Sequence, residues 1–344
     1  MALHQLDVVV TRGDTVESYH RVHAAVVDQC DNLHSAAGDS DLNTWWRSCA
    51  KPFQIMPLLE CGAFDEFGWG DEELCLACAS HGGEPEHLAI VEAMLGTLGL
   101  EEGDLACGPH DPLTNRGAKI ARDSGTRIKR THNNCSGKHA AMLALAKHNG
   151  WALEGYERSD HPVQQAMLNQ VALWTGVPPA QVRVAIDGCG AAVFGISLEQ
   201  MARAYARLGR AAERNEDIPS RIVAAIARHP FLVGGTDRFD SIVIEETGGR
   251  VITKVGAEGV HSAVVLDSGF GIALKVEDGN PRAQHPALVQ LLLELDALPL
   301  PLPARLADYL NKPVKNSRGD VVGETRMSED SGRTARAEAE AAVI

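Results

Sequence analysis

The sequence predicts an α+β fold, in which strands from both ends of the chain form an antiparallel sheet and a helical part is inserted between them. Three observations support this prediction. Runs of β-branched residues lie near the start of the chain, runs with helical spacing fill its middle, and short β-rich runs fill its last third. Strands and helices segregated in this way favour α+β over alternating α/β architecture. We expect a single domain at residues 1–326, with a sheet subdomain at 1–50 and 236–326 and a helical part at 51–235.

The first strand is predicted at residues 6–11, a β-branched run that ends where Gly13 and Asp14 supply turn chemistry. Residues 16–28 continue as a second strand-like region, so the two are expected to form a hairpin. The next segment, residues 31–43, is polar and is expected to be a loop.

The middle of the chain has the pattern of a series of helices. Apolar residues recur at helical spacing, as with Leu88, Val91, Met94 and Leu95 on one face. Several of these runs stop at a glycine, which is typical of a helix C-terminus. The predicted helices are residues 52–61, 71–79, 86–98, 138–148, 161–175, 198–208 and 218–228.

The last third changes to short β-rich runs separated by glycines, the pattern of an antiparallel meander. The expected strands are residues 242–246, 251–255, 261–266 and 271–277, followed by a final helix at 286–297 and a closing strand at 321–325. Residues 327–344 have little apolar surface to bury and are expected to form a flexible tail.

The composition excludes several classes of function. The net charge of −14 repels phosphate backbones, so nucleic acid is not an expected partner. No run approaches the length of about 18 apolar residues that a membrane span needs, and no signal-peptide pattern is visible at the N-terminus. We therefore expect a cytoplasmic protein, whose eight cysteines are mostly core residues and not disulfides.

The first candidate for chemistry is the pair Ser48 and Lys51, followed by Pro52. Proline is tolerated near the start of a helix, so the pair is expected in or just before a first turn, with both side chains on one face. A serine hydroxyl needs a base to become a nucleophile, and a lysine with a lowered pKa can be that base. Ser-x-x-Lys also arises by chance as a helix cap and a solvated lysine. The apolar helix that follows favours a buried nucleophile.

Ser80 and Lys254 form a second candidate pair. Ser80 follows a helical run and precedes Gly82 and Gly83, so it can face a cleft or simply end the helix. Lys254 ends a predicted strand and is followed by small residues. It resembles the lysine of the Lys-Thr-Gly strand in serine β-lactamases and penicillin-binding proteins, which lies on an edge strand facing a Ser-x-x-Lys helix. An exposed strand lysine is the plainer interpretation.

Two further stretches suggest a metal site. Residues 132–139 are rich in hydrogen-bonding side chains, and glycines flank Cys189. Cys135 and Cys189, with a nitrogen donor from Lys138 or His139, would supply the three ligands of an open zinc site. Cys75 and Cys78 are the rival ligands, but they lie on an apolar helix without a second pair and are interpreted as core.

Together these stretches resemble the L-asparaginase II family of the thermolabile, rhizobial type (class 3), which is related in fold to serine β-lactamases and glutaminases. The resemblance extends from about Val8 to Thr325. It is carried, in chain order, by Arg47-Ser48-Cys49-Ala50-Lys51-Pro52, Ser80-His81-Gly82-Gly83, Asn134-Cys135-Ser136-Gly137-Lys138-His139, Asp187-Gly188-Cys189-Gly190 and residues 254–259.

The resemblance implies hydrolysis of L-asparagine to L-aspartate and ammonia through an acyl-enzyme on Ser48. Lys51 would be the partner of this nucleophile. Ser80 would pair with a second lysine, for which Lys254 is the best match and Lys275 the fallback. The family also suggests a homodimer.

The resemblance further implies a zinc ion held by Cys135, Lys138 and Cys189, which would aid substrate binding more than bond breaking. A lysine can serve as ligand only if the metal displaces its proton. Asp187 would lie nearby, through a metal-bound water. Arg47 and His139 are candidates to hold the carboxylate or carboxamide of the substrate.

Four other functions stay open at this point. The same residues would suit a glutaminase or a broader ω-amidase, because one methylene group changes specificity by only about 1–3 kcal/mol. A β-lactamase or transpeptidase would use the same serine and lysines. A zinc amidohydrolase would attack with metal-bound water. A metal-dependent binding protein would show no turnover.

Overall fold

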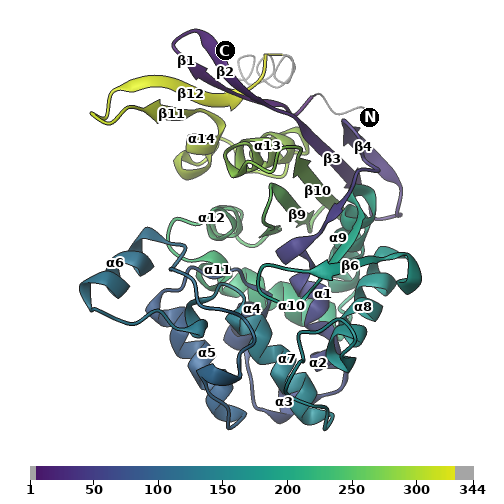
Figure 1. Cartoon of the computed structure of the whole chain (residues 1–344). Coiled ribbons are helices and arrows are strands. Elements are labelled where there is room, and N and C mark those ends of the chain that lie inside the picture. Colours follow the sequence, from purple (N-terminus) through teal and green to yellow (C-terminus); the bar gives the residue numbers. More distant parts are fainter. Residues whose placement is uncertain (1–4, 330–344) are drawn as a thin grey trace.

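The computed structural model describes residues 5–329 (Figure 1). The predicted α+β class is confirmed, since the sheets are antiparallel and most helices follow one another in the middle of the chain. β1 (Val8–Arg12) pairs with β12 (Val321–Met327), and β3 (Val22–Val27) pairs with β10 (Phe270–Val276). Strands from the two ends of the chain therefore share sheets, as expected.

The described strands form three antiparallel sheets. The largest has the order β4-β3-β10-β9-β8, with β8 (Val251–Val255) at one edge. A second sheet has the order β11-β12-β1-β2, and a third has the order β5-β7-β6. The remaining strands are β2 (Thr15–His20), β4 (Leu33–Ala37), β5 (Asn43–Trp45), β6 (Arg183–Ile186), β7 (Ala192–Ser197), β9 (Val260–Val265) and β11 (Lys312–Lys315).

Most helices lie between β5 and β8 in the chain. They are, with the 3₁₀ turns marked η, η1 (Arg47–Ala50), α1 (Lys51–Gln54), α2 (Met56–Glu60), α3 (Ala63–Glu66), α4 (Asp71–Cys78), α5 (Pro85–Thr97), η2 (Glu102–Asp104), α6 (Asn115–Asp123), η3 (Arg130–His132), α7 (Ser136–His148), α8 (Pro162–Thr175), η4 (Pro179–Gln181), α9 (Leu198–Glu213), α10 (Asp217–Arg228), α11 (Pro230–Gly234) and α12 (Phe239–Glu246). After the last β-strands of the large sheet come α13 (Pro281–Glu294) and α14 (Ala304–Leu310).

The large sheet separates two apolar cores. Alternate residues of a strand point to opposite faces, and β3 follows this rule: Ala25 and Val27 join one core, whereas Ala24 and Val26 join the other. Helix α9 packs directly on one face, where a Cβ at Gly271 would lie 2.0 Å from the carbonyl oxygen of Ala202. Helix α13 contributes to the core on the other face.

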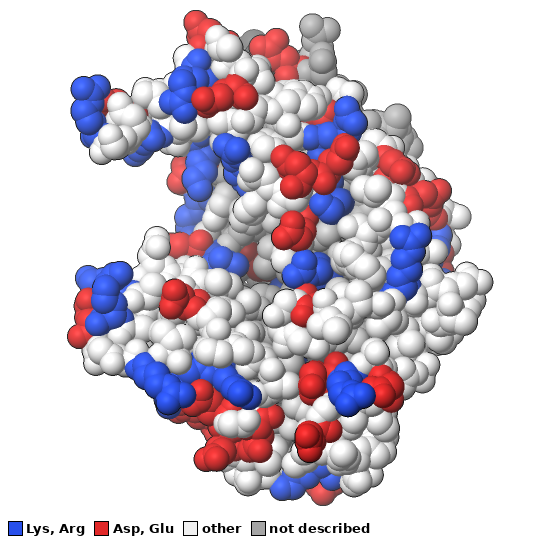
Figure 2. Space-filling view, viewed as in Figure 1, with Lys and Arg blue, Asp and Glu red and all other residues white. Residues whose placement is uncertain are grey.

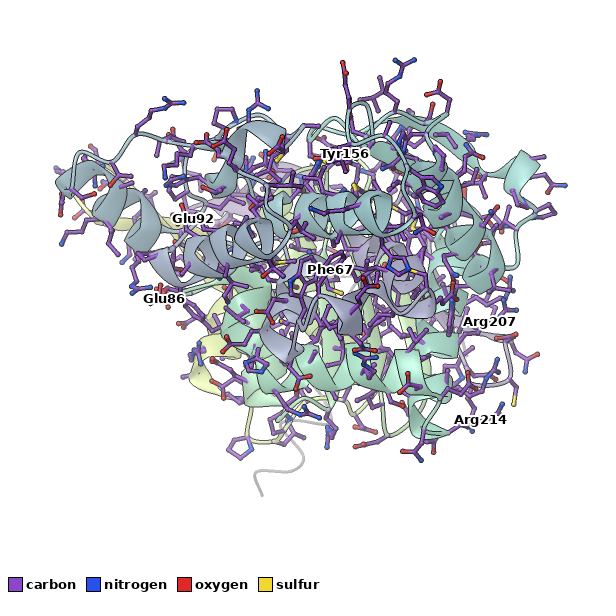
Figure 3. The ribbon with its side chains drawn as sticks, turned by 90° about the horizontal axis from the view of Figure 1, so that it is seen from below. Phe67, Glu86, Glu92, Tyr156, Arg207 and Arg214 are labelled. Atoms are coloured by element: carbon purple, nitrogen blue, oxygen red, sulfur yellow. The ribbon has the colours of Figure 1, made fainter. Side chains whose placement is uncertain are left out.

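Helix α7 forms the centre of the helical part. Its residues from Ser136 to Ala146 are all buried, which is the pattern of a helix covered on every side. Viewed from below, the helices fill the picture, with Glu86 and Glu92 on α5 at one side and Arg207 and Arg214 at the other (Figure 3). The buried start of α7 carries Lys138, and Cys135 directly precedes the helix; both are predicted metal ligands.

The surface mixes charges of both signs. Figure 2 shows acidic and basic side chains interspersed over one face, and a wide notch between the arm made by β11 and β12 and the segment that carries α6. Within residues 5–329, no helix combines the length and apolar character needed to cross a membrane.

The structure corrects four sequence predictions. Residues 242–246, expected as a strand, belong to helix α12, because its β-branched residues are buried without the alternation that marks a half-exposed strand. The expected loop at 31–43 contains β4. The region 16–28 is two strands in different sheets, β2 and β3. Several helices, among them α6 and α14, had no predicted counterpart.

The predicted tail is only partly described. Met327 ends β12, and the backbone N–H of Ser328 donates to the carbonyl of Asp7 at 2.8 Å. The predicted tail residues 330–344 lie outside the described part of the chain. The boundaries proposed for the sheet and helical subdomains stay a prediction.

Candidate active site

The turn that carries Ser48 is anchored from both sides. Trp46 is completely buried, and its indole N–H donates to Ser262 Oγ at 3.1 Å. The Cys49 thiol donates to the carbonyl of Lys254 at 3.0 Å, and the Tyr205 hydroxyl donates to the carbonyl of Cys49 at 2.8 Å. These bonds fix the turn between the large sheet and α9.

Arg47 has a φ of +53°, in the left-handed region. Such a conformation costs a residue with a side chain about 1–3 kcal/mol, so the surrounding contacts must hold it in place. The next residue is Ser48, which is half-buried, whereas Cys49 is completely buried. Ser48 is thus the residue of this turn that presents a hydroxyl toward accessible space.

Lys51 begins α1, and Pro52 follows it in the first turn, as the sequence predicted. The Lys51 side chain is completely buried. Its Nζ donates to the carbonyl of Ala79, lies 3.1 Å from Ser80 Oγ and lies 3.4 Å from the carbonyl oxygen of Asn134. Lys51 therefore bonds to Ser80 and to the loop before α7, not to Ser48.

Ser80 lies between two lysines. Lys254 Nζ approaches Ser80 Oγ to 2.8 Å, and Lys51 Nζ approaches the same oxygen to 3.1 Å. A serine hydroxyl has one proton and can accept more than one hydrogen bond, so it can donate to one amine while it accepts from the other lysine. The two predicted Ser-Lys pairs are thus one connected group, Lys51–Ser80–Lys254.

Lys254 lies on β8, at the edge of the large sheet, in the position that the sequence predicted. Burial lowers the pKa of Lys254 to about 8, and the neighbouring Lys51 also lowers it, while the carboxylate of Asp240 acts in the opposite direction. Lys254 is therefore mostly protonated at pH 7 and mostly a neutral amine above about pH 8. The fallback residue, Lys275, lies on β10 and donates to the carbonyls of Val276 and Glu277, away from Ser80.

Arg47 and Asp187 form an ion pair beside the Ser48 turn. Arg47 Nε lies 2.7 Å from Asp187 Oδ1, which also accepts from the backbone N–H of Gly188 at 2.7 Å. Although burial acts to raise it, Lys138 and Arg47 hold the pKa of the Asp187 carboxyl below its usual value. The site thus offers a fixed positive and a fixed negative charge side by side.

The structure brings together Cys135, Lys138 and Cys189, the three predicted metal ligands. Lys138 Nζ lies 3.4 Å from Cys189 Sγ. The Cys135 thiol, through its hydrogen bond, and then Lys138 lower the pKa of Cys189 to about 5, so this sulfur is a thiolate. Although burial acts against its charge, Cys189 and Cys135 raise the pKa of Lys138.

This donor set fits zinc in its two sulfur atoms and in the adjacent carboxylate of Asp187, and it requires the unusual loss of a proton from Lys138. No cluster of three His, Cys, Asp or Glu side chains suited to a metal occurs in residues 5–329. Any site therefore depends on the lysine. The rival pair Cys75 and Cys78 is buried in the apolar core, as the sequence predicted.

His139 is also completely buried, next to Lys138 on α7. Its Nδ1 lies 2.7 Å from the hydroxyl of Tyr156, whereas its Nε2 is buried with no partner in the described structure. Burial and the charge of Lys138 lower the pKa of His139 to about 3, so the ring is neutral. A neutral ring can hydrogen-bond a carboxamide but cannot pair by charge with a carboxylate.

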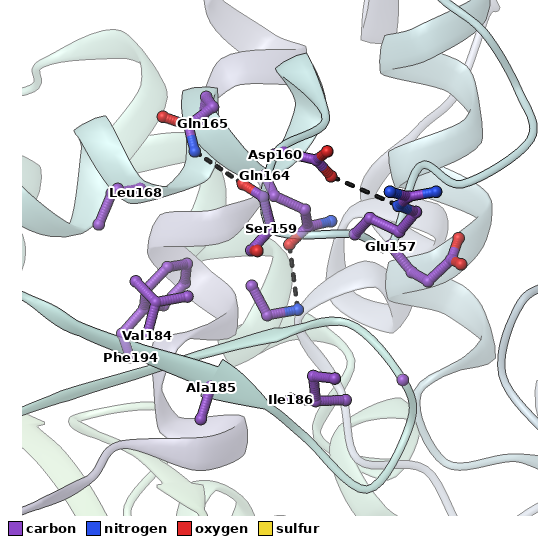
Figure 4. A pocket seen from close by; sticks show the side chains of 13 residues that line it. Glu157, Ser159, Asp160, Gln164, Gln165, Leu168, Val184, Ala185, Ile186 and Phe194 are labelled. Carbon is purple, nitrogen blue, oxygen red and sulfur yellow. Dashed lines mark hydrogen bonds and ion pairs between the residues drawn. The ribbon is translucent and has the colours of Figure 1, made fainter.

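A groove of about 860 Å³ lies on another side of the hairpin that carries Asp187 and Cys189 (Figure 4). It runs between α8 and the strands β6 and β7. A hydrogen bond of 3.3 Å from the backbone N–H of Ala192 on β7 to Gln164 Oε1 on α8 joins its two sides. None of the predicted catalytic, substrate or metal residues lines it. The predicted site residues therefore lie around Ser48 and not in this groove.

Sequence reasoning missed several residues that support the site. His110 accepts the backbone N–H of Asn134 at 2.8 Å, and Tyr156 accepts the backbone N–H of Ala106 at 2.8 Å. Asp240 lies on α12, two residues before the run mistaken for a strand. None of these residues stands in a recognisable motif, so only their spatial position reveals them.

Comparison with known proteins gives one informative match. The profile of the L-asparaginase II family matches residues 8–327. Among curated proteins no match was found. A β-lactamase from Mycobacterium bovis is similar in structure, with a TM-score of 0.41 and 13% identity over 80% of this chain and 95% of its own. A β-lactamase-like protein from Bacteroides dorei has a TM-score of 0.39 and 12% identity over 83% of this chain and 93% of its own. At these TM-scores the two likenesses carry no argument.

Proposed function

Because this chain belongs to the L-asparaginase II family, a family of amidohydrolases, we propose that it hydrolyses L-asparagine to L-aspartate and ammonia through an ester on Ser48. The observation that carries the proposal is the connected group Lys51–Ser80–Lys254 beside the Ser48 turn. Two buried lysines that share one hydroxyl form a path for protons, which amide hydrolysis needs in both of its steps.

Ser48 is the better nucleophile of the two serines. It is half-buried, whereas Ser80 is 6% exposed and lies between the two lysines. A nucleophile must reach a substrate carbon, and a proton carrier need not. The strained φ of Arg47 also favours this assignment, since strained backbone tends to be retained where function requires it.

In the first step, Ser48 Oγ attacks the side-chain amide carbon, and its proton passes through Lys51 and Ser80 to Lys254, which supplies the neutral amine. Backbone N–H groups of the same turn stabilise the oxyanion. The C–N bond then breaks, and the Lys51–Ser80–Lys254 group returns the proton to the leaving nitrogen, which departs as ammonia. In the second step, the same group takes a proton from a water molecule, which attacks the ester. L-Aspartate is released and Ser48 regains its proton.

The paired charges of Arg47 and Asp187 support an amino acid as substrate. A free amino acid carries an α-carboxylate and an α-ammonium, and these match a guanidinium and a carboxylate that lie 2.7 Å apart. The neutral ring of His139, with its free Nε2, is suited to a hydrogen bond with the carboxamide.

We further propose that Cys135, Lys138 and Cys189 hold a zinc ion. Bound there, zinc would supply positive charge and orientation at the side of the site next to Asp187. Bond breaking stays with Ser48 and the lysines, since Lys51 reaches this loop at the carbonyl of Asn134, whereas the metal donors are the side chains of Cys135, Lys138 and Cys189. The homodimer and the cytoplasmic location stay predictions.

Ammonia release from L-asparagine and L-glutamine by wild type, Ser48→Ala and the control Ser124→Ala tests the proposal. We expect fast release from asparagine by wild type and the control, and a loss of several orders of magnitude in Ser48→Ala. Faster turnover of glutamine would support the glutaminase alternative. Activity near wild type in Ser48→Ala would sink the acyl-enzyme scheme, and loss of kcat on chelation in that variant would then favour attack by metal-bound water.

A further inference from the structure

Asp240 is a buried acid that the scheme above does not use. It lies on α12, is 2% exposed, and faces the edge strand β8. Its Oδ2 accepts the backbone N–H of Val255 at 2.8 Å. Its Oδ1 accepts from the hydroxyl of Thr253 at 3.3 Å and from the ring of His261 at 2.8 Å. The carboxylate therefore binds the residues immediately before and after Lys254.

These contacts determine the face of strand β8 to which the Lys254 side chain points. Alternate residues of a strand point to opposite faces, so fixing positions 253 and 255 toward α12 directs the residue between them to the other face. That face carries Ser80, whose oxygen lies 2.8 Å from Lys254 Nζ. Cys49 bonds to the carbonyl of Lys254 and holds the same strand from the Ser48 turn.

The charges around Lys254 come from each element that packs against it. Asp240 acts from α12, Lys51 from α1, Cys49 from η1 and Cys135 from the loop before α7. Burial raises the pKa of Cys49 to about 12, and its hydrogen bond with Cys189 together with burial raises that of Cys135 to about 12, so both are neutral thiols. Asp240 is the member of this set that is negative at neutral pH.

Asp240 keeps its charge in spite of burial. Burial acts to raise its pKa, but His261 and then Lys254 hold it well below the usual range of a carboxyl. Of its other neighbours, His285 on α13 has a pKa lowered to about 3 by burial and by His261, so that ring is neutral. The negative charge is therefore shared between His261 and Lys254.

We propose that Asp240 is a positioning residue for Lys254, which holds the strand on both sides of this lysine and faces it with a buried negative charge. The inference rests on the proposed role of Lys254 in proton transfer. Asp240 touches neither substrate nor Ser48 in this scheme. Its effect is to aim the amine at Ser80 and to determine how readily that amine keeps its proton.

The test is a pH titration of the Lys254 side chain by NMR on protein labelled with [ε-¹³C]lysine, with the Lys254 signal assigned by its loss in Lys254→Met. In Asp240→Asn we expect the midpoint to fall by about one pH unit, because an opposite charge has been removed. The rising limb of the kcat/KM profile, which reports Lys254, should shift to lower pH by the same amount. The value of kcat should fall about tenfold, with little change in KM.

Two variants separate charge from structure. Asp237→Asn makes the same exchange at an exposed position three residues earlier, where φ is +58° and asparagine fits, and should match wild type. Thr253→Val removes a hydrogen bond of Asp240 but keeps its charge. It should lower the unfolding temperature and leave the Lys254 midpoint within a few tenths of a unit.

A folded Asp240→Asn protein with the wild-type Lys254 midpoint would overturn the inference. If that variant does not fold, Asp240→Ser, which is smaller and neutral but still offers an acceptor to Val255, is titrated in its place with the same expected shift. The titration needs no turnover. It therefore tests Asp240 even if wild type releases no ammonia, an outcome that would count against the proposed function alone.

Discussion

The Nζ atom of Lys254 lies 2.8 Å from the Oγ atom of Ser80, although 174 residues separate them in the chain. The edge strand β8 brings the lysine to one side of the site, and the segment after α4 brings the serine to the other. The contact extends the proposed proton path from Ser80 to Lys254 and favours Lys254 over Lys275 as the second lysine.

Lys254→Met should abolish most of the activity, whereas Lys275→Met should not. Lys254 is buried against Ser80, and general acid–base groups contribute about 10²–10⁴-fold to rate. Lys275 bonds only to backbone carbonyls of its own strand end, so its loss should change kcat less than about threefold. Steady-state kinetics of the two variants with asparagine check this, and the reverse order would transfer the role to Lys275.

Ser80→Ala should lower kcat by about 10²–10⁴-fold and leave KM close to wild type. The change removes the one hydroxyl that joins Lys51 to Lys254, but it leaves Ser48, Arg47 and Asp187 in place. Single-turnover measurements of ester formation and ester hydrolysis would show which step is slowed. If the variant turned over at the wild-type rate, the two lysines would have to act without a shared carrier.

The activity should rise with pH through about 8. The pKa of Lys254 is lowered to about 8, so the side chain is mostly protonated below this pH and mostly a neutral amine above it. A step that needs the amine as proton acceptor gains rate as the pH rises and levels off above the pKa. The profile of kcat/KM between about pH 6 and pH 10 measures this. Lys254→Arg should lose the rising limb, because arginine does not titrate in that range.

The ion pair of Arg47 and Asp187 predicts a pattern across two substrates. Succinamate is asparagine without the α-ammonium group. Asp187→Asn should therefore raise KM for asparagine about 10- to 100-fold but change KM for succinamate little. Arg47→Met should raise KM for both, because both keep the carboxylate. Arg183→Met, at an exposed position on β6, is the matched control. Equal effects of Asp187→Asn on the two substrates would mean that this acid does not bind the ammonium.

Zinc binding should depend on Cys135 and Cys189. Equilibrium dialysis against zinc, followed by metal analysis, should find one ion per wild-type chain and none in Cys135→Ser or Cys189→Ser. Cys30→Ser, which changes an exposed thiol, and Cys75→Ser, which changes a core thiol of the rival pair, should bind as wild type does. Full occupancy in Cys189→Ser would exclude the proposed ligands whatever the activity of the protein.

The overall class of the fold could be predicted because the spacing of apolar residues and the composition change along the chain. These changes coincide with the change from strands to helices and back to strands in the structure. The strand at 251–255 and the helices around α7 and α8 lie where apolar spacing placed them. Helix α12 could not be recognised, because its buried β-branched residues look the same in a helix and in a strand when no polar face interrupts them. The strand β4 could not be recognised, because its Leu33 is exposed and its Ser35 is buried, the reverse of the usual pattern.

Candidate site residues could be named from the sequence, but the contacts between them could not. Ser48, Lys51, Ser80 and Lys254 stand in recognisable motifs, and the structure gathers the last three within hydrogen-bond distance. Packing between segments far apart in the chain brings both lysines to Ser80. It also brings Asp240 to the residues on each side of Lys254. Local spacing contains no information on such contacts.

The left-handed backbone at Arg47 lowers the stability of the fold, while the Arg47 side chain is proposed to bind the substrate. Stability and activity therefore place opposite demands on this position. Glycine would adopt this conformation freely, so Arg47→Gly relieves strain and can gain about 1 kcal/mol where the contacts allow it. The same exchange deletes the guanidinium that faces Asp187. Laboratory selection for heat resistance alone would thus favour a substitution here that selection for turnover would reject. A more thermostable variant that keeps its activity therefore needs stabilising substitutions at other positions.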